Sequence, residues 1–332
     1  MKRMFSFSIW ILIFLLIAFA AGGCRRARPA REEGKINVTS LTFPSYDFVR
    51  AIAGDRVNLV LLTSPGSGSH SFEPSPRDII TIRGSDLYIY PGSENYAWMD
   101  RILESVDMPD GGMKILKLVD MVDAVEEVLI EGMEDDHHHH HDDDDDDDDH
   151  GDLEEHRGLD EHVWTSPKNA KLIVAAITEA LCELDSANAG FYRQNASEYS
   201  AHLDELDAAF QAVVDGARRN TIVVGDRFPF RYLADAYGLE YFAAFPGCST
   251  ETEASAATVA FLINKVRSEN IPVIFHIELS NERMADAISE ASGARKLPLH
   301  SVQNVTMRDF NRGATYLDLQ KTNVDNLREA LW

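Results

Sequence analysis

The sequence predicts an α/β protein of two lobes, each a parallel, Rossmann-like sheet covered by helices, joined by one long rigid linker helix. Two observations carry this prediction. Short strand-like apolar segments alternate with segments of helical periodicity, both early and late in the chain. Between these two sets, residues 167–218 keep helical spacing with no proline after Pro167.

The first lobe is predicted over residues 35–186. The segment KINVTSLTFPSYDFVRAIAG predicts a strand and then a helix that ends at Gly54, and VNLVLLTSP predicts the next strand. The segment PRDIITIRGSDLYIYPG predicts a helix, a connection and a third strand.

The second lobe is predicted over residues 219–332. A break near residues 186–190 separates two helices, and the second of them, residues 187–218, is the predicted linker. The predicted strands are NTIVVGD, EYFAAFP, IPVIFHIEL and KLPLHSV, with helices in RYLADAYGL, SAATVAFLINKVRSEN and SNERMADAISEASG. The segment FPGCSTETEASAA predicts a helix start capped by Ser249 or Thr250.

Residues 1–23 have the layout of an export signal. Lys2 and Arg3 precede an apolar run that ends in Ala-Gly-Gly-Cys, which resembles a bacterial lipoprotein cleavage box. Cleavage would leave Cys24 as the lipidated first residue, followed by a linker over residues 24–34. The alternative is an uncleaved anchor. An uncleaved anchor would still tether the protein outside the cytoplasm. We expect an exported protein, lipid-anchored to the outer face of the cytoplasmic membrane or periplasmic. Cys182 and Cys248 then remain, and they do not require a disulfide.

Residues 134–156 set five consecutive histidines against eight consecutive aspartates. The stretch has too little apolar surface for a core, so we expect a loop, and its imidazoles and carboxylates together bind ions such as zinc. The alternatives are a merely solubilising acidic run and a purification tag, although tags stand at chain ends. The stretch carries fourteen negative charges of a chain whose net charge is −24, and this balance excludes nucleic-acid binding. The predicted metal-capture residues are His137, His138, His139, His140, His141, His150 and His156.

Five possible metal ligands stand at strand ends or helix starts. In doubly wound sheets, ligands bind beyond the carboxyl ends of the strands, so side chains from both lobes can meet in the cleft between them. His276 shares a strand face with one of these residues, and it is either a core histidine or part of the site. The five candidates are His70, His162, Asp226, Glu278 and His300.

Several segments resemble the metal-binding lipoproteins of bacterial zinc and manganese ABC importers, over essentially the whole mature chain. HSFEPSPRD matches the family pattern H-x-x-E-P-x-P-x-D, with His70 and Glu73, and DEHVWTSPKNA matches D-x-H-V-W-x-x-P, with Asp160, His162 and Trp164. GDRFPFRYLADAYGL and GATYLDLQKTNVDNLREAL extend the resemblance, and an acidic, histidine-rich loop between the first two motifs is typical of zinc-type members. The resemblance implies two lobes that hold one metal ion between them for delivery to a membrane permease.

The chain departs from this family at two ligand positions. Where many relatives have a histidine or glutamate as third ligand, Arg227 stands here, and arginine cannot bind a cation because it stays protonated. Where relatives have an aspartate as fourth ligand, His300 stands. The predicted shell is therefore His70, His162, His300 and one carboxylate, with Glu278 preferred to Asp226. The residues predicted to lie around this shell are Glu73, Trp164, Arg227, paired with Asp226, and His276.

Three imidazoles and one carboxylate suit tetrahedral Zn²⁺, whereas Mn²⁺ prefers oxygen ligands and is disfavoured. A closed shell predicts a carrier and not an enzyme, because catalytic zinc keeps one position open. A secreted zinc hydrolase is one alternative, but neither H-E-x-x-H nor H-x-H-x-D-H occurs. An adhesin-type surface lipoprotein with incidental metal is the other. We expect a monomer whose partners are the metal ion and a cognate ABC permease.

Overall fold

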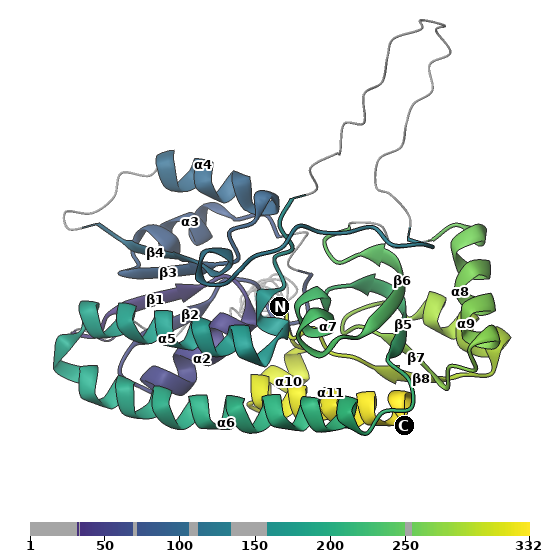
Figure 1. The fold of residues 1–332 in the computed structure, drawn as a ribbon. Helices are drawn as coiled ribbons and strands as arrows, with labels where there is room; N and C mark the ends of the chain where they lie inside the picture. Colours follow the sequence, from purple (N-terminus) through teal and green to yellow (C-terminus); the bar gives the residue numbers. More distant parts are fainter. Residues whose placement is uncertain (1–31, 33, 69–71, 106–111, 134–157, 250–253) are drawn as a thin grey trace, which may run out of the picture. The chain divides into compact units, whose positions relative to one another are not determined.

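The computed structural model describes residues 32, 34–68, 72–105, 112–133, 158–249 and 254–332. Residues 36–332 form one unit of the chain and residues 1–35 another. The larger unit contains two four-stranded sheets flanked by helices (Figure 1), so the predicted fold class is confirmed. Among the described residues, no helix is both long and apolar enough to span a membrane.

The first sheet has the strand order β2-β1-β3-β4, with every neighbouring pair parallel. Alternate residues of β3 face opposite sides: Leu87 and Ile89 join the core that includes α2 and α5, while Tyr88 and Tyr90 join a separate core that includes α3 and α4. The elements are β1 (Asn37–Ser40), α2 (Phe43–Ala53), β2 (Asn58–Leu61), α3 (Pro76–Arg83), β3 (Leu87–Tyr90), η1 (Glu94–Tyr96), α4 (Ala97–Ser105), β4 (Lys114–Lys117) and η2 (Leu118–Met121).

Two elements of the first lobe were not predicted, namely helix α4 and strand β4. Strand β4 has the sequence KILK, and its two lysines and four-residue length leave no clear alternation of apolar and polar positions. It is nevertheless an edge strand, where charged ends are well tolerated.

The second sheet repeats the same order as β6-β5-β7-β8, again all parallel. Its four strands were all predicted. The predicted cap of α8 is wrong, because the helix begins at Ala256 and the side chain of Ser255 accepts a hydrogen bond from the Thr258 backbone N–H at 3.1 Å. The elements are β5 (Thr221–Phe228), α7 (Arg231–Tyr237), β6 (Glu240–Pro246), α8 (Ala256–Ser268), β7 (Val273–His276), α9 (Arg283–Ser292) and β8 (Arg295–Pro298).

Helices α5 (Pro167–Leu184) and α6 (Ala189–Asp215) lie between the two sheets in the sequence, separated by η4 (Ser186–Asn188). Helix α6 has 27 residues and is about 40 Å long at the usual rise per residue. A single hydrophobic core includes residues of both sheets and of this helix, such as Ile89, Phe210 and Val224. The shared core makes α6 a stiff connection, as predicted.

The chain ends in α10 (Met307–Asn311) and α11 (Tyr316–Leu331). The Tyr316 backbone N–H donates to Asp47 Oδ2 at 2.6 Å, and its hydroxyl donates to the Trp164 carbonyl at 2.7 Å. Its ring also packs edge-on against Phe48, at 4.9 Å between centroids. The last helix therefore holds the start of α5 and the helix α2 of the first sheet in place.

Candidate metal centre

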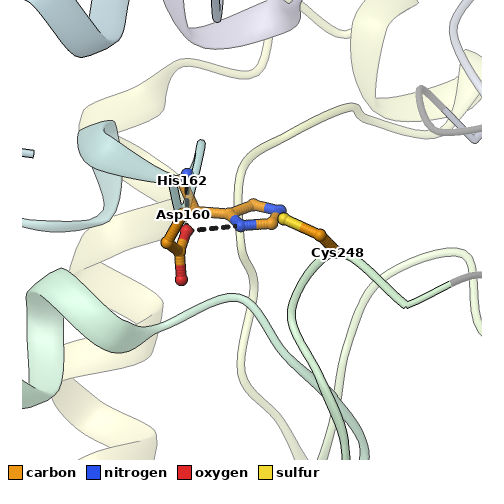
Figure 2. Close-up of side chains that lie close together, drawn as sticks. All are labelled: Asp160, His162 and Cys248. Atoms are coloured by element: carbon orange, nitrogen blue, oxygen red, sulfur yellow. Dashed lines mark hydrogen bonds and ion pairs between the residues drawn. The ribbon is translucent and has the colours of Figure 1, made fainter. Parts of the chain in front are cut away.

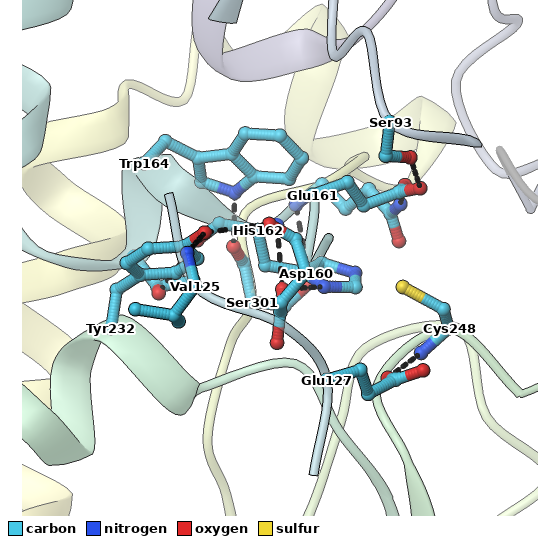
Figure 3. A network of polar contacts seen from close by, with 12 residues as sticks. Ser93, Val125, Glu127, Asp160, Glu161, His162, Trp164, Tyr232, Cys248 and Ser301 are labelled. Atoms are coloured by element: carbon cyan, nitrogen blue, oxygen red, sulfur yellow. Dashed lines mark hydrogen bonds and ion pairs between the residues drawn. The ribbon is translucent and has the colours of Figure 1, made fainter. Parts of the chain in front are cut away.

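The segment that precedes α5 is completely buried. None of the residues from Asp160 to Ser166 is more than 2% exposed. His162 is the N-cap of a short 3-10 turn, η3 (Val163–Thr165), and its carbonyl accepts hydrogen bonds from the backbone and hydroxyl of Thr165 at 3.0 and 2.8 Å. Because buried polar side chains require partners, the contacts of this segment define the site (Figure 3).

Asp160 fixes the orientation of the His162 ring. Its Oδ1 accepts a hydrogen bond from the His162 backbone N–H at 2.8 Å and lies 2.9 Å from ring atom Nδ1. A carboxylate on one ring nitrogen orients the other toward a metal ion and raises its basicity, which is the usual arrangement behind histidine ligands. Asp160 is thus a positioning residue, and Nε2 of His162 is the candidate metal-binding atom.

Cys248 follows β6 and approaches the same ring. Figure 2 shows its sulfur pointing toward the imidazole, on the side of the ring opposite Asp160. One ligand atom from each of Asp160, His162 and Cys248 lies within 4.8 Å of the other two, and among the described residues this is the group of metal-ligating type that the fold brings together. Nitrogen, sulfur and carboxylate oxygen are the atoms that bind zinc in proteins, so the group fits that ion.

Two further side chains hold the parts of this group together. Glu127 Oε1 accepts a hydrogen bond from the Cys248 backbone N–H at 2.7 Å. The Tyr232 hydroxyl donates to the Asp160 carbonyl at 2.7 Å and accepts from the Val125 backbone N–H at 3.2 Å. The segments that contain Val125 and Asp160 are therefore bound to α7 and to the turn after β6.

Glu161 is buried but has a different role from its neighbours. Its carboxylate accepts four hydrogen bonds, three from the first lobe and one from the segment after β8. Neutral donors therefore satisfy this carboxylate and anchor the Asp160–His162 segment from its other side. The donors are the Ser93 hydroxyl at 3.2 Å, the Asn95 amide at 3.3 Å, the Tyr96 hydroxyl at 3.0 Å and the Gln303 amide at 2.9 Å.

The electrostatics of the group favour a bound cation. Burial lowers the pKa of His162, but the charge and hydrogen bond of Asp160, with the charges of Glu161 and Glu127, outweigh burial and raise it. Burial raises the pKa of the Cys248 thiol well above its ordinary value, and the same carboxylates add to the rise. Added positive charge is stabilised here and added negative charge is not, which suits a divalent ion.

Of the predicted ligands, the structure places His162 in this group. The ring of Trp164, predicted to lie around the site, has its centroid 5.6 Å from that of His162, and its indole N–H donates to the Ser301 carbonyl at 2.8 Å. The other predicted neighbour, Glu73, has an exposed side chain before α3. Three sets of predicted residues lie outside the described residues, namely Cys24, His70 and the histidines between 137 and 156.

Glu278 and His300 lie beside each other and are not members of the group around His162. Glu278 Oε2 is 3.5 Å from His300 Nδ1 and accepts a hydrogen bond from the Ser301 backbone N–H at 2.7 Å, and Oε1 is bonded to the Ser301 hydroxyl. His300 Nδ1 accepts from the Val302 backbone N–H at 2.9 Å, which uses its lone pair. Both side chains hold the loop after β8, and their role as metal ligands stays a prediction.

Asp226 and Arg227 stand near the end of β5, and they too are not members of that group. Asp226 Oδ1 accepts a hydrogen bond from the Arg227 backbone N–H at 2.9 Å and lies 4.0 Å from its Nε. The Arg227 guanidinium donates to the Ser249 carbonyl at 3.3 Å, so it contacts the turn that carries Cys248. The ring of His276 lies 3.2 Å from the Ile277 carbonyl oxygen and 3.8 Å from the Glu282 carboxylate.

Two residues of the group were not assigned to the predicted shell. Asp160 stands two residues before His162 in the segment DEH, and that spacing was a signal for a carboxylate that orients the ring. Cys248 gave no comparable signal, because no second cysteine and no histidine stands near it and it lies far from His162 in the sequence.

Comparison with known proteins identifies the family of the chain. Residues 38–330 match the model of the family described as "ZnuA: Zinc-uptake complex component A periplasmic". The high-affinity zinc uptake system protein ZnuA of Bacillus subtilis (strain 168) is 29% identical over 318 residues, which cover 96% of this chain and 94% of that protein.

Two solved structures share the fold. The metal-dependent lipoprotein YcdH from Bacillus subtilis superposes with a TM-score of 0.71 at 27% identity, over 90% of this chain and 99% of that one. The Zn(II)-bound ZnuA-like domain of Streptococcus pneumoniae AdcA gives 0.69 at 26% identity, with coverage of 90% and 99%. By name, these relatives are a zinc-uptake protein, a metal-dependent lipoprotein and a Zn(II)-bound ZnuA-like domain, and the family is one of zinc-uptake components and not of enzymes. The chain therefore belongs to the ZnuA family of periplasmic zinc-uptake components.

Proposed function

We propose that this protein captures Zn²⁺ outside the cytoplasm and delivers it to the permease of an ABC importer. The observation that carries the proposal is the buried ring of His162, oriented by Asp160 and approached by the sulfur of Cys248. Membership of a zinc-uptake family and likeness to a Zn(II)-bound structure support the same ion. Nitrogen and sulfur ligands also favour Zn²⁺ over the harder Mn²⁺.

The geometry favours a carrier over a catalyst. A zinc hydrolase needs a metal-bound water with an open coordination position and access for substrate. Here the whole segment that carries His162 is no more than 2% exposed, and the nearest carboxylate, Asp160, is engaged with the ring. We therefore assign the ion as cargo.

The remaining parts of the proposal concern location and the other ligands. The export signal and Cys24 support a lipid-anchored protein, in line with the likeness to a lipoprotein, and the histidines of residues 134–156 would gather zinc near the site. We keep His70 as a proposed ligand. His300 with Glu278 or Asp226 would complete the shell only after giving up the hydrogen bonds that they make here.

The test is the zinc content and affinity of the full-length protein, measured by competition with a chelator that removes weakly held ions. His162→Ala should lose the tight site, with a fall in affinity of about a hundredfold or more, since even residues behind a ligand contribute ten- to hundredfold. The matched control is His202→Ala, whose exposed side chain lies on α6 and should change nothing.

His162 is fully buried, so circular dichroism has to show that the variant folds, and His162→Gln provides a second variant of closer size. Tight zinc binding that survives in folded His162→Ala would refute the site. Delivery is tested separately by zinc uptake in cells that carry the importer: the His162 variant should fail to support uptake, whereas a surface adhesin with incidental metal should adhere equally well without this residue.

A further inference from the structure

We infer that the thiolate of Cys248 is a direct ligand of the transported zinc ion, in place of the third ligand that Arg227 cannot supply. This inference rests on the proposed function and concerns the chemistry of the same site. It makes the centre a mixed nitrogen and sulfur site rather than one built from imidazoles and carboxylates alone.

The first support is distance. Zn–N bonds of roughly 2.0–2.1 Å and a Zn–S bond of about 2.3 Å, at tetrahedral angles, place nitrogen and sulfur about 3.5 Å apart. One ring nitrogen of His162 and the sulfur of Cys248 already lie within 4.8 Å of each other. Rotation of the two side chains therefore suffices to bind one ion between them.

The second support is the way the turn that carries Cys248 is held. Its backbone N–H is bonded to Glu127, and the next carbonyl, of Ser249, accepts from the Arg227 guanidinium. A side chain at Gly247 would place its Cβ 2.8 Å from the Phe228 carbonyl oxygen, so glycine lets the turn lie against the end of β5. Arg227, at the position where the resemblance implies a ligand in many relatives, instead holds the turn that carries Cys248.

The third support is the environment of the sulfur. The carboxylates of Glu161, Asp160 and Glu127 surround the thiol. When zinc binds, the S–H bond breaks, the proton leaves to solvent and the electron pair of sulfur forms the S–Zn bond. The charge of the ion then offsets the carboxylates that surround the thiolate in the metal-free protein.

The other described cysteine supplies a matched control. Cys182 lies on α5, where its sulfur is 3.6 Å from the Ala189 carbonyl oxygen, and it is not a member of the group. It is also buried. Substitution of Cys182 by serine therefore changes one thiol without touching the site.

The experiment replaces zinc with Co²⁺ in the full-length protein and records its absorption. A cobalt–thiolate bond gives a near-ultraviolet charge-transfer band that nitrogen and oxygen ligands do not give, so the histidine-rich stretch cannot produce it. The wild type and Cys182→Ser should show the band, and Cys248→Ser should lack it. Zinc affinity should fall about a hundredfold in Cys248→Ser and stay unchanged in Cys182→Ser.

The outcomes separate this inference from the proposed function. A charge-transfer band that persists in Cys248→Ser, or is absent from the wild type, overturns the thiolate ligand even if zinc is still bound tightly through His162. A wild-type protein that does not bind zinc tightly overturns the proposed function. Cys248→His is a rescue variant: it should recover part of the zinc affinity while the band stays absent, because a nitrogen ligand then takes the place of sulfur.

Discussion

Of the three histidines predicted as ligands, His162 and His300 lie within the described residues, and their surroundings are opposite. His162 is bonded through Nδ1 to the carboxylate of Asp160, whereas Nδ1 of His300 accepts the backbone N–H of Val302. In the first case the carboxylate favours the neutral ring with its proton on Nδ1, which leaves the lone pair of Nε2 for a metal ion. In the second the lone pair of Nδ1 is used, and the ring proton of a neutral imidazole lies on Nε2.

The carboxylates differ in the same way. Asp160 bonds to the ring of His162 and to its backbone, while Glu278 binds the backbone and hydroxyl of Ser301. Residue type and position at a strand end are therefore not enough to identify a ligand. The partner of the second ring nitrogen decides whether a buried histidine is prepared for a metal or braces a loop.

The largest effect on zinc affinity is expected from removing the carboxylate that distinguishes His162 from His300. Asp160→Asn removes the charge that orients His162 and should weaken zinc binding by about ten- to hundredfold. Chelator competition measures this change. The control is Asp204→Asn, an exposed carboxylate paired with Lys171 on the surface. Unchanged affinity in Asp160→Asn would show that the ring needs no such partner.

The pH dependence of zinc affinity and of stability also tests the role of Asp160 beside His162. The pKa of His162 is raised, so protons compete with zinc already above the ordinary histidine value of about 6.5. Below the raised pKa, protonation of His162 should lower the affinity by about a further tenfold per pH unit, beyond the loss caused by the thiol proton of Cys248. The folding stability of the metal-free protein changes with pH in the opposite direction to zinc affinity. Stabilisation from this protonated group is present below the unfolded-state value and is lost as pH rises through the raised pKa.

Zinc titrations across this range and thermal unfolding without metal measure the two trends. In Asp160→Asn the onset of weakening should move to lower pH, because a major cause of the raised pKa is gone. An onset that stays in place would show that Asp160 does not set the proton affinity of the ring.

A smaller effect is expected from the turn that carries Cys248. Gly247→Ala adds a methyl group 2.8 Å from the Phe228 carbonyl oxygen, so the turn has to shift by several tenths of an ångström. Zinc affinity should fall by about tenfold, since small displacements of a ligand weaken a preorganised site. Gly190→Ala, on α6 with open space around it, is the control. Equal affinity in both variants would mean that the turn does not position a ligand.

The smallest effect on metal binding is expected at Glu278. Glu278→Gln weakens the charge-assisted bonds to Ser301 and should cost about 1–2 kcal/mol of unfolding free energy while zinc affinity stays the same. Urea unfolding of the metal-free protein measures the first quantity. Exposed Glu205→Gln should change neither. A large loss of zinc affinity in Glu278→Gln would instead restore Glu278 to the shell.

Most of the fold followed from the sequence because long parallel α/β alternation leaves a clear pattern. Buried strands such as Leu87–Tyr90 are continuous apolar runs between helical segments, and Pro167 marks the start of α5. Strand β4 was missed because its lysine-flanked sequence has no such pattern, and the start of α8 was misplaced because several serines and threonines compete for the cap.

The site was only partly predictable for a different reason. His162 stands in a motif with Asp160, so its local partner is visible in the sequence. Cys248 is brought to the ring by the crossing of two distant segments, tied by Glu127 and Tyr232. His300 has the right residue type, but its engagement with Val302 depends on the backbone of a loop, which periodicity does not reveal.

The bond between Tyr316 and the Trp164 carbonyl has a consequence for how the protein matures. An exported chain crosses the membrane with its amino end first, so the residues around His162 emerge long before the last helix. Until Tyr316 arrives, the segment beside the ring lacks one of the contacts that fixes it. Half-translocated chains should therefore be poor scavengers of zinc, and the ion should be taken up after synthesis and export are complete.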